Sequence, residues 1–430
     1  MNADAIRALD AADRLAPLRE RFALPPDTVY LDGNSLGALP KATAERMRTT
    51  VEHEWGEGLI RSWNRARWVE LAADVAARIG RLVGGRAEHV SVGDSTSINL
   101  FKVLSAAAAL VDRSTGRQTL VSERDNFPTD LYLAESVCER HGLELVLVDG
   151  ADLAAALDER TAILLLTHVN YRTGRRWAMR ETTAAAHAAG ALVVWDLAHS
   201  AGAVPLALEA DEADFAVGCG YKYLNGGPGA PAFLWVHPRH LERIDREGLR
   251  QPLSGWLGHA APFAFEAAYR PAAGIGRFAC GTWPVLSLTA LEEGVKVFDA
   301  AEALGGMQAL RAKSVALVDA FVGAVEARCA GHGLRLVTPR DAEQRGSQAS
   351  FACPEGVDAY ALMQALIDRG VIGDFRAGAR DRSEADLMRF GFAPLYNTFD
   401  DAWRAAGTLA DLLATGAWRD PRFAARSAVT

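Results

Sequence analysis

An aspartate and a lysine, each at the end of an apolar run, are the residues of this chain best placed to do chemistry. Asp196 ends the run ALVVWD, and Lys222 follows the run DFAVGC. A lysine is seldom buried unless it is paired or used chemically. If both runs are strands of one parallel sheet, the two side chains lie at the edge where open α/β sheets bind ligands.

The pair meets the requirements of a pyridoxal phosphate site. A lysine amine forms a Schiff base with the aldehyde of that cofactor, and an aspartate keeps the pyridine nitrogen protonated so that the ring accepts electrons. For Asp196 alone, a turn residue at a strand end is the simpler interpretation. For Lys222 alone, a surface charge is the ordinary alternative. The cofactor hypothesis therefore depends on further residues.

Two other turns could complete such a site. Ser95 and Thr96, in SVGDSTSINL, lie where a strand passes into a helix, and helix N-termini bind phosphate through free backbone amides. A capping role is the ordinary alternative and is compatible with phosphate binding. In NFPTD, Phe127 could stack on a cofactor ring and Asp130 could secure the loop, or the segment could be a simple loop staple. The order of hydroxyl turn, aromatic loop, aspartate and lysine favours the cofactor site.

The elements that must position these residues are predicted to form a mostly parallel sheet between helices. Nearly continuous apolar runs, among them LELVLV, TAILLLT, ALVVW and APAFLWV, alternate with helical patterns, as is typical of strands buried on both faces. Residues 40–295 are expected to form this large α/β domain. Long amphipathic helices and shorter strand-like runs predict a smaller α+β domain over residues 296–430, to which an N-terminal arm, residues 1–39, contributes.

Composition and charge limit the classes of function. The 430 residues carry a net charge of −8 without a basic stripe, so no nucleic-acid surface is expected. No apolar run reaches the roughly 20 residues that span a bilayer, and the N-terminus lacks the apolar core of a secretion signal. The five cysteines are scattered, which indicates no metal site and no disulfide framework. A soluble, cytoplasmic protein without a membrane partner is expected.

The assembled segments resemble kynureninases, a family within the class V aminotransferase group of fold-type I pyridoxal-phosphate enzymes. NFPTDLY, QPLSGWLGH and CGTWPVLSL single out this family, and YLDGNSLG, WDLAHSAGAVP, GCGYKYLNGGPG and RFGFAPLYNTF are also similar. The resemblance implies the fold-type I transferase fold and a hydrolase that splits L-kynurenine, and 3-hydroxy-L-kynurenine too, into anthranilate or 3-hydroxyanthranilate and L-alanine. A place in tryptophan degradation or NAD biosynthesis would follow. The polar stretch 376–386 is longer than the family's usual connection.

The resemblance also implies how the cofactor is held. Lys222 would carry pyridoxal 5'-phosphate, Asp196 would pair with its ring nitrogen, and Tyr221 would contact the phosphate and act as a proton donor. The other cofactor-binding residues that it implies are Ser95, Thr96, Phe127, Pro128, Thr129, Asp130, Thr167 and His199.

Substrate and partner contacts follow from the same resemblance. Arg389 would bind the substrate α-carboxylate in a bidentate fork. The aromatic end of the substrate would lie near Asn34, Ser35 and Trp63. Trp256 and Thr282 would reach the cofactor from the partner subunit, so that the site needs a homodimer.

Other functions stay open at this point. A cysteine desulfurase or selenocysteine lyase shares the fold and the lysine but needs a mobile nucleophilic cysteine. Cys353 is the one suitable candidate, although a small buried core residue is its more ordinary role. A class V aminotransferase would need a keto-acid acceptor. A pyridoxal-binding regulator without catalysis would need a DNA-binding or partner module, and no basic recognition helix is visible in the sequence.

Overall fold

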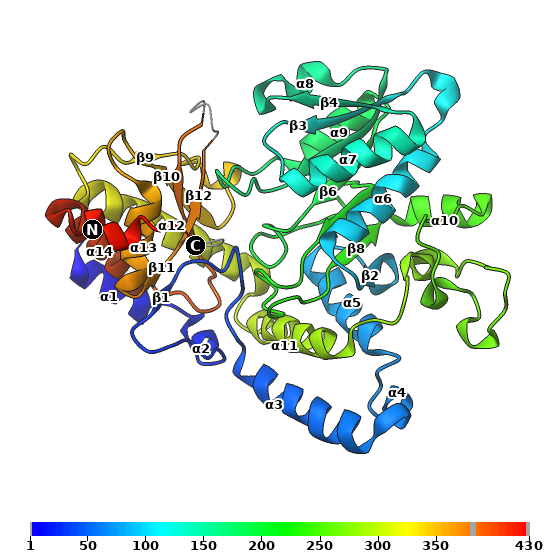
Figure 1. The fold of residues 1–430 in the computed structure, drawn as a ribbon, viewed down its shortest axis with the longest axis horizontal. Helices are drawn as coiled ribbons and strands as arrows, with labels where there is room; N and C mark the ends of the chain where they lie inside the picture. Colours follow the sequence, from blue (N-terminus) through cyan, green and yellow to red (C-terminus); the bar gives the residue numbers. More distant parts are fainter. Residues whose placement is uncertain (1, 379–383, 427–430) are drawn as a thin grey trace.

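The computed structural model describes residues 2–378 and 384–426 and has two lobes that lie side by side (Figure 1). A seven-stranded sheet forms the centre of the larger lobe, and a four-stranded sheet forms that of the smaller one. The first and last described residues lie at the smaller lobe (Figure 1). Within the described residues, every helix is too short or too polar to cross a bilayer.

The large sheet is mostly parallel, as the apolar runs predict. Its strands run parallel from β4 to β7, β8 is antiparallel to β7, and β2 is antiparallel to β8. The spatial order is β2 (Val90–Val92), β8 (Phe233–Val236), β7 (Phe215–Gly218), β6 (Leu192–Asp196), β5 (Thr161–Thr167), β3 (Thr119–Glu123) and β4 (Glu144–Val148).

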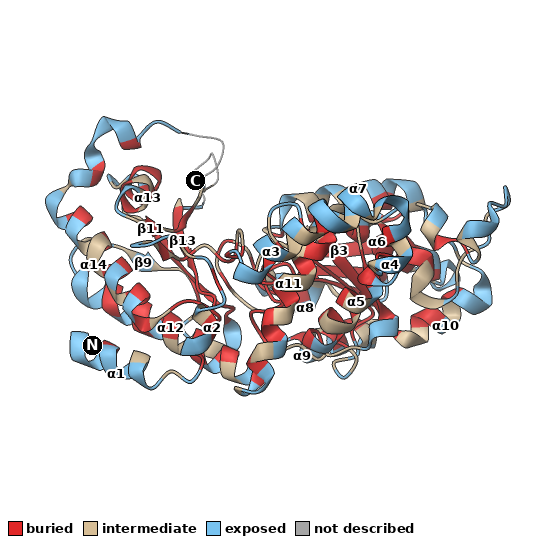
Figure 2. Ribbon diagram, turned by 90° about the horizontal axis from the view of Figure 1, so that it is seen from below, coloured by how far each residue is buried: buried red, intermediate tan, exposed pale blue. Residues whose placement is uncertain are grey.

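Helices cover both faces of this sheet, which explains why its central strands are nearly continuously apolar. Along β5, Ile163 and Leu165 pack into the core under α6 and α7, whereas Leu164 and Leu166 face the core that α5 and α11 share. Figure 2 shows buried strands between helices whose outer faces are exposed. The helices of this lobe are α3 (Lys41–Thr49), α4 (Ser62–Arg65), α5 (Leu71–Leu82), α6 (Thr96–Leu110), α7 (Pro128–His141), α8 (Leu153–Ala156), α9 (Met179–Ala188), α10 (Pro238–Glu247) and α11 (Val285–Glu302).

The smaller lobe has an antiparallel sheet with helices packed on it. Its strand order is β12 (Asp374–Arg376), β13 (Leu387–Gly391), β10 (Gln348–Ala352) and β9 (Arg335–Leu336). Phe321, Phe351 and Phe390 lie in its core. Its helices are α1 (Ala3–Ala11), α2 (Ala16–Arg19), α12 (Gly306–Arg328), α13 (Ala359–Asp368) and α14 (Phe399–Thr415).

The N-terminal arm joins this lobe through a two-stranded parallel pairing. Here β1 (Val29–Tyr30) lies beside β11 (Val371–Ile372), with Val29 opposite Val371. The predicted boundary at residue 295 falls within α11, so this helix continues from the larger lobe toward α12. The domain limits themselves stay a prediction.

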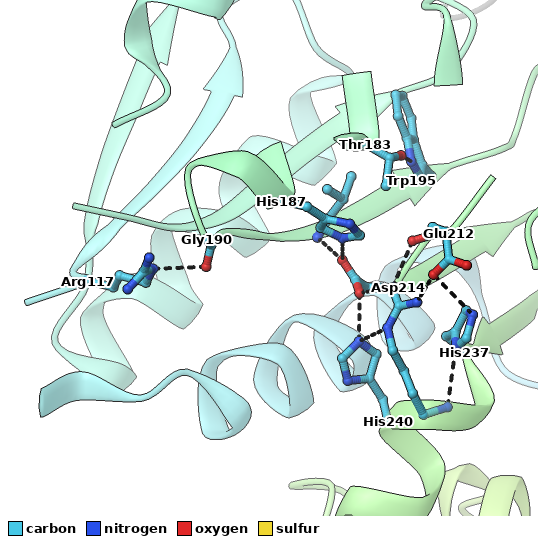
Figure 3. A network of polar contacts seen from close by, with 11 residues as sticks. Arg117, Thr183, His187, Gly190, Trp195, Glu212, Asp214, His237 and His240 are labelled. Carbon is cyan, nitrogen blue, oxygen red and sulfur yellow. Dashed lines mark hydrogen bonds and ion pairs between the residues drawn. The ribbon is translucent and has the colours of Figure 1, made fainter. Parts of the chain in front are cut away.

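Asp214, directly before β7, anchors three other elements of the large lobe (Figure 3). The carboxylate of this fully buried residue accepts hydrogen bonds from Val193 N of β6 at 2.7 Å, His187 Nε2 of α9 at 2.8 Å and His240 Nε2 of α10 at 2.6 Å. Arg239 also forms an ion pair with it at 2.5 Å. Burial alone would raise the pKa of Asp214, but the hydrogen bonds from His187 and His240 outweigh burial and hold the pKa below its ordinary value.

Asp214→Ala should lower the free energy of unfolding by about 3 kcal/mol, because it leaves several buried donors without an acceptor. Asp214 has a depressed pKa, so its stabilisation is present above its ordinary pKa and is lost as the pH falls. The difference in free energy of unfolding between wild type and variant should therefore shrink below about pH 4. Urea unfolding at several pH values measures this difference.

Glu212→Ala is the matched control for this anchor. Glu212 pairs with the same Arg239, but its side chain is 65% exposed. Its loss should cost less than about 1 kcal/mol. Equal unfolding midpoints for the two variants would contradict the anchoring role of Asp214.

Candidate active site

The carboxyl ends of neighbouring strands bring the first site residues together. Thr167 of β5 and Asp196 of β6 are partners in the parallel ladder, and Asp196 is paired in turn with Val217 of β7. The chain leaves β7 at Gly218 and reaches Lys222 in the following turn. Because parallel strands end at one edge of a sheet, Thr167, Asp196 and Lys222 surround one space.

That space is a cavity of about 140 Å³. Cavities of about 150 Å³ hold a benzene molecule in other proteins, so a six-membered ring fits a space of this size. Its walls contain these residues expected from the sequence: Ser95, Thr96, Phe127, Thr129, Asp130, Thr167, Asp196, His199, Tyr221 and Lys222. They also contain Ser97, Tyr171 and Ala198, which the sequence interpretation did not include.

Two buried carboxyl groups face each other on one wall. Burial, followed by repulsion from Asp196, raises the pKa of Asp130 well above its ordinary value. Burial also raises the pKa of Asp196, although the charge of Lys222 opposes this shift. Asp196 Oδ1 accepts a hydrogen bond from the Ala198 amide at 2.7 Å, and Thr167 Oγ1 lies 3.4 Å from Asp130 Oδ2. This wall suits a ligand that brings a cationic N–H group.

Lys222 and His199 are in contact on another wall. Lys222 Nζ lies 3.0 Å from His199 Nε2. Burial, followed by the charge of Lys222, lowers the pKa of His199 well below its ordinary value, so this imidazole is neutral and its Nε2 can accept a hydrogen bond. The same Nζ lies 6.0 Å from the centre of the Phe127 ring and 5.7 Å from that of Tyr221. An aromatic ligand beside Lys222 would therefore contact the ring of Phe127 or Tyr221.

The N-terminus of α6 provides the anion-binding end of the cavity. Ser95 is its N-cap and accepts a hydrogen bond from Ile98 N at 3.3 Å, so the capping role is real. The cavity also touches Thr96 and Ser97, in the first turn of this helix. The buried Lys102 of the same helix holds the preceding turn, because its Nζ lies 2.6 Å from Asp94 Oδ2. Helix N-termini with adjacent hydroxyl groups bind phosphate.

Several residues expected at the site do not line this cavity. Pro128 begins α7 and fixes the turn after Phe127. Trp63 packs edge-on against Trp68, with ring centres 5.8 Å apart. Trp256 is 40% exposed and stacks on Phe265. Thr282 is exposed in the loop before α11.

Arg389 of β13 is buried behind the cavity wall, with 1% of its side chain exposed. Its Nη1 donates to the Tyr171 carbonyl at 2.6 Å, and its Nη2 donates to Ser35 Oγ at 2.7 Å and to Asp374. When the Asn34 amide is turned so that its oxygen and its nitrogen both have partners, the oxygen accepts a hydrogen bond from Arg389 Nε at 2.9 Å. Ser35 and Asn34 thus contact the expected carboxylate-binding arginine.

Tyr171 is the clearest residue that the sequence interpretation missed. Its ring meets that of Phe127 edge-on, with centres 5.3 Å apart, while its carbonyl holds Arg389. The available signal was its place in HVNYRTG, directly after the apolar run that forms β5. Of the polar stretch 376–386, residues 379–383 lie outside the described residues. The described part includes Glu384, whose carboxylate lies 3.2 Å from Arg172 Nη2.

Comparison with known proteins assigns the chain to a family. Residues 310–409 match the family described as the kynureninase C-terminal domain. Kynureninase from Burkholderia mallei (strain ATCC 23344) is 54% identical over 98% of both chains, and kynureninase from Pseudomonas fluorescens is 51% identical over the same shares. The chain belongs to the kynureninase family.

Solved structures similar to this kynureninase-family chain confirm the expected fold. The apo cysteine desulfurase from Thermococcus onnurineus NA1 matches with a TM-score of 0.77 and 18% identity, over 93% of this chain and 98% of that one. A C-DES mutant with glycine covalently linked to its PLP cofactor matches with a TM-score of 0.77 and 18% identity, over 91% of this chain and 99% of that one. At this identity the likeness shows the fold-type I architecture.

Proposed function

We propose that this chain is a pyridoxal-phosphate-dependent hydrolase that splits L-kynurenine, and 3-hydroxy-L-kynurenine as well, into an anthranilate and L-alanine. The observation that carries the proposal is the cavity where Lys222, Asp196 and the α6 N-terminus meet, in a chain 54% identical to a kynureninase over 98% of its length. Family membership favours this reaction over the others that the fold supports.

The residues around the cavity fit pyridoxal phosphate. Lys222 would bind its aldehyde carbon, the α6 N-terminus with Ser95 and Thr96 would bind its phosphate, and Phe127 would cover its ring. The raised pKa values of Asp196 and Asp130 favour this assignment, because a protonated pyridine nitrogen supplies the cation that two buried carboxyl groups need. When bound, the cofactor supplies an electron sink for cleavage of bonds at the substrate carbon chain.

The chain's own residues then orient the substrate and move protons. The Lys222 amine takes the proton from the substrate α-carbon, and its contact with His199 keeps it at the cavity wall. Burial raises the pKa of the Tyr221 hydroxyl, so this group stays protonated near neutral pH and can donate a proton to the carbon that becomes the alanine methyl group. Arg389 binds the α-carboxylate, and Tyr171 holds that arginine in place.

We also propose that the working form is a cytoplasmic homodimer. Trp256 and Thr282 lie outside the cavity of their own chain and are accessible on the surface, which supports their contribution to a partner's site. The aromatic end of the substrate would then meet residues from both chains. Because Trp63 packs on Trp68 of the same chain, its proposed substrate contact has less support.

The desulfurase alternative needs a reactive cysteine, and Cys353 is a poor one. Burial raises the pKa of its thiol to about 12, whereas a nucleophilic cysteine needs a lowered pKa. Cys353 also packs against the core of the smaller lobe. These observations favour the hydrolase over a cysteine desulfurase or selenocysteine lyase.

A panel of four reactions separates the candidate functions. The purified, pyridoxal-phosphate-loaded protein is mixed with L-kynurenine, 3-hydroxy-L-kynurenine, L-cysteine, or L-kynurenine plus a keto acid. We expect anthranilate and its 3-hydroxy form from the first two reactions, without any need for the keto acid. Sulfide from L-cysteine, or product formation only with the keto acid, would instead indicate a desulfurase or an aminotransferase.

A further inference from the structure

The guanidinium group of Arg389 is almost fully engaged by the protein itself. Arginine carries five N–H donors, and four of them bond to described residues, namely Tyr171, Ser35, Asp374 and Asn34. A carboxylate gripped in a bidentate fork needs two donors on one edge. A substrate carboxylate can therefore bind Arg389 only if at least one of these contacts is exchanged.

When both neighbouring carboxylates are ionised, the charges beside Arg389 are balanced before any substrate arrives. Among the described residues, Arg389 and Arg376 face two carboxylates, those of Asp374 and Asp32. Asp374 contacts both arginines directly, whereas Asp32 Oδ1 lies 3.9 Å from Arg389 Nη2. A third carboxylate, brought by the substrate, would leave an excess negative charge in a buried site. Such an excess is costly unless a proton neutralises it.

We propose that Asp32 takes up a proton when the substrate carboxylate binds Arg389, so that Asp32 sets the pH dependence of substrate affinity. The inference rests on the proposed function, in which Arg389 is the carboxylate-binding residue. Asp32 is the suitable proton acceptor because its contact with Arg389 is long, whereas Asp374 is held by two arginines.

The groups that face Asp32 support this assignment. Burial, followed by repulsion from Asp374, raises the pKa of Asp32 to about 7, and Arg389 and Arg376 oppose the shift. A further carboxylate on Arg389 adds repulsion and raises this pKa again. The other groups that face Asp32 are two that do not titrate, namely Ser35 and the Asn34 amide, whose nitrogen donates to Asp32 Oδ1 at 3.2 Å. Three tyrosines whose pKa burial raises also face it, namely Tyr30, Tyr223 and Tyr396.

The test uses 4-(2-aminophenyl)-4-oxobutanoate, which is kynurenine without its α-amino group and so cannot replace Lys222 on the cofactor. Its inhibition constant against L-kynurenine is measured from pH 6 to 8.5 with the loaded enzyme. We expect a constant value below about pH 7 and a rise approaching tenfold per pH unit above it. Calorimetry of the same binding in two buffers of different ionisation enthalpy, at pH 7.5, should show uptake of roughly half to three quarters of a proton.

Asp32→Asn, which imitates the protonated form, should bind the inhibitor with one affinity across this range and take up no proton. Asp32→Glu should restore the pH dependence. Glu123→Gln is the matched control. Burial, and after it repulsion from Asp125, raises the pKa of Glu123 to about 7 as well. Glu123 contacts Arg175 and Trp177. This control should keep the wild-type profile.

The inference and the proposed function fail in different ways. Binding of the inhibitor without proton uptake in the wild type, or loss of the pH dependence in Glu123→Gln, would overturn the role of Asp32. Failure of the inhibitor to bind at any pH would overturn it too. Absence of anthranilate from L-kynurenine would instead remove the proposed function, even if the inhibitor bound with proton uptake.

Discussion

Lys222→Ala should abolish turnover of L-kynurenine, with a loss of more than about 10⁴-fold in kcat. This loss exceeds what one proton-transfer group typically contributes, because Lys222 has two roles: it binds the cofactor covalently and it moves the substrate α-proton. The purified variant should also lack the visible absorbance of lysine-bound pyridoxal phosphate. Spectra and initial rates of anthranilate formation measure both effects.

Lys41→Ala is the matched control, because Lys41 is an exposed lysine at the start of α3. It should keep both the spectrum and the rate of the wild type. Retention of visible absorbance and turnover in Lys222→Ala would show that the cofactor is attached elsewhere, and the proposed role of the cavity would be wrong.

Asp196→Ala has the second largest expected effect. Without this carboxylate the pyridine nitrogen loses the group that keeps it protonated, and the remaining neighbour, Asp130, has a pKa raised by burial. We expect kcat to fall by at least about 10²-fold, as when one preorganised electrostatic partner of a reacting group is removed. KM should change far less, since Asp196 is not expected to touch the substrate.

Asp149→Ala provides the comparison for Asp196. Asp149 follows β4 of the same sheet, just as Asp196 ends β6, but its side chain is 73% exposed. Its loss should leave kcat within about twofold, because an exposed surface charge contributes little. Near-normal turnover in Asp196→Ala would contradict its pairing with the cofactor ring.

The large sheet could be predicted because its strands are buried on both faces. Leu164 and Leu166 pack toward one helix layer and Ile163 and Leu165 toward the other, so β5 is apolar at every position between its terminal threonines. The two-residue strands of the smaller lobe lack such a signal. The pairing of β1 with β11 joins residues far apart in the sequence, and neither strand is long enough to show a period.

The cofactor end of the site was predictable for a related reason. Strand ends and helix starts are visible in the sequence, and in a parallel sheet they meet at one edge. The substrate end depends on contacts between lobes that no local pattern encodes. The burial of Arg389, its contacts with Ser35 and Asn34, and the carbonyl of Tyr171 behind it became visible only once both lobes were in place.

Cleavage of L-kynurenine at this cavity is tested by a product measurement with the pyridoxal-phosphate-loaded wild-type protein and L-kynurenine alone. Anthranilate is followed by its fluorescence, and L-alanine is quantified in the same samples. We expect rapid release of both products in a 1:1 ratio. A protein that carries the cofactor on Lys222 but forms neither product would contradict the proposed reaction.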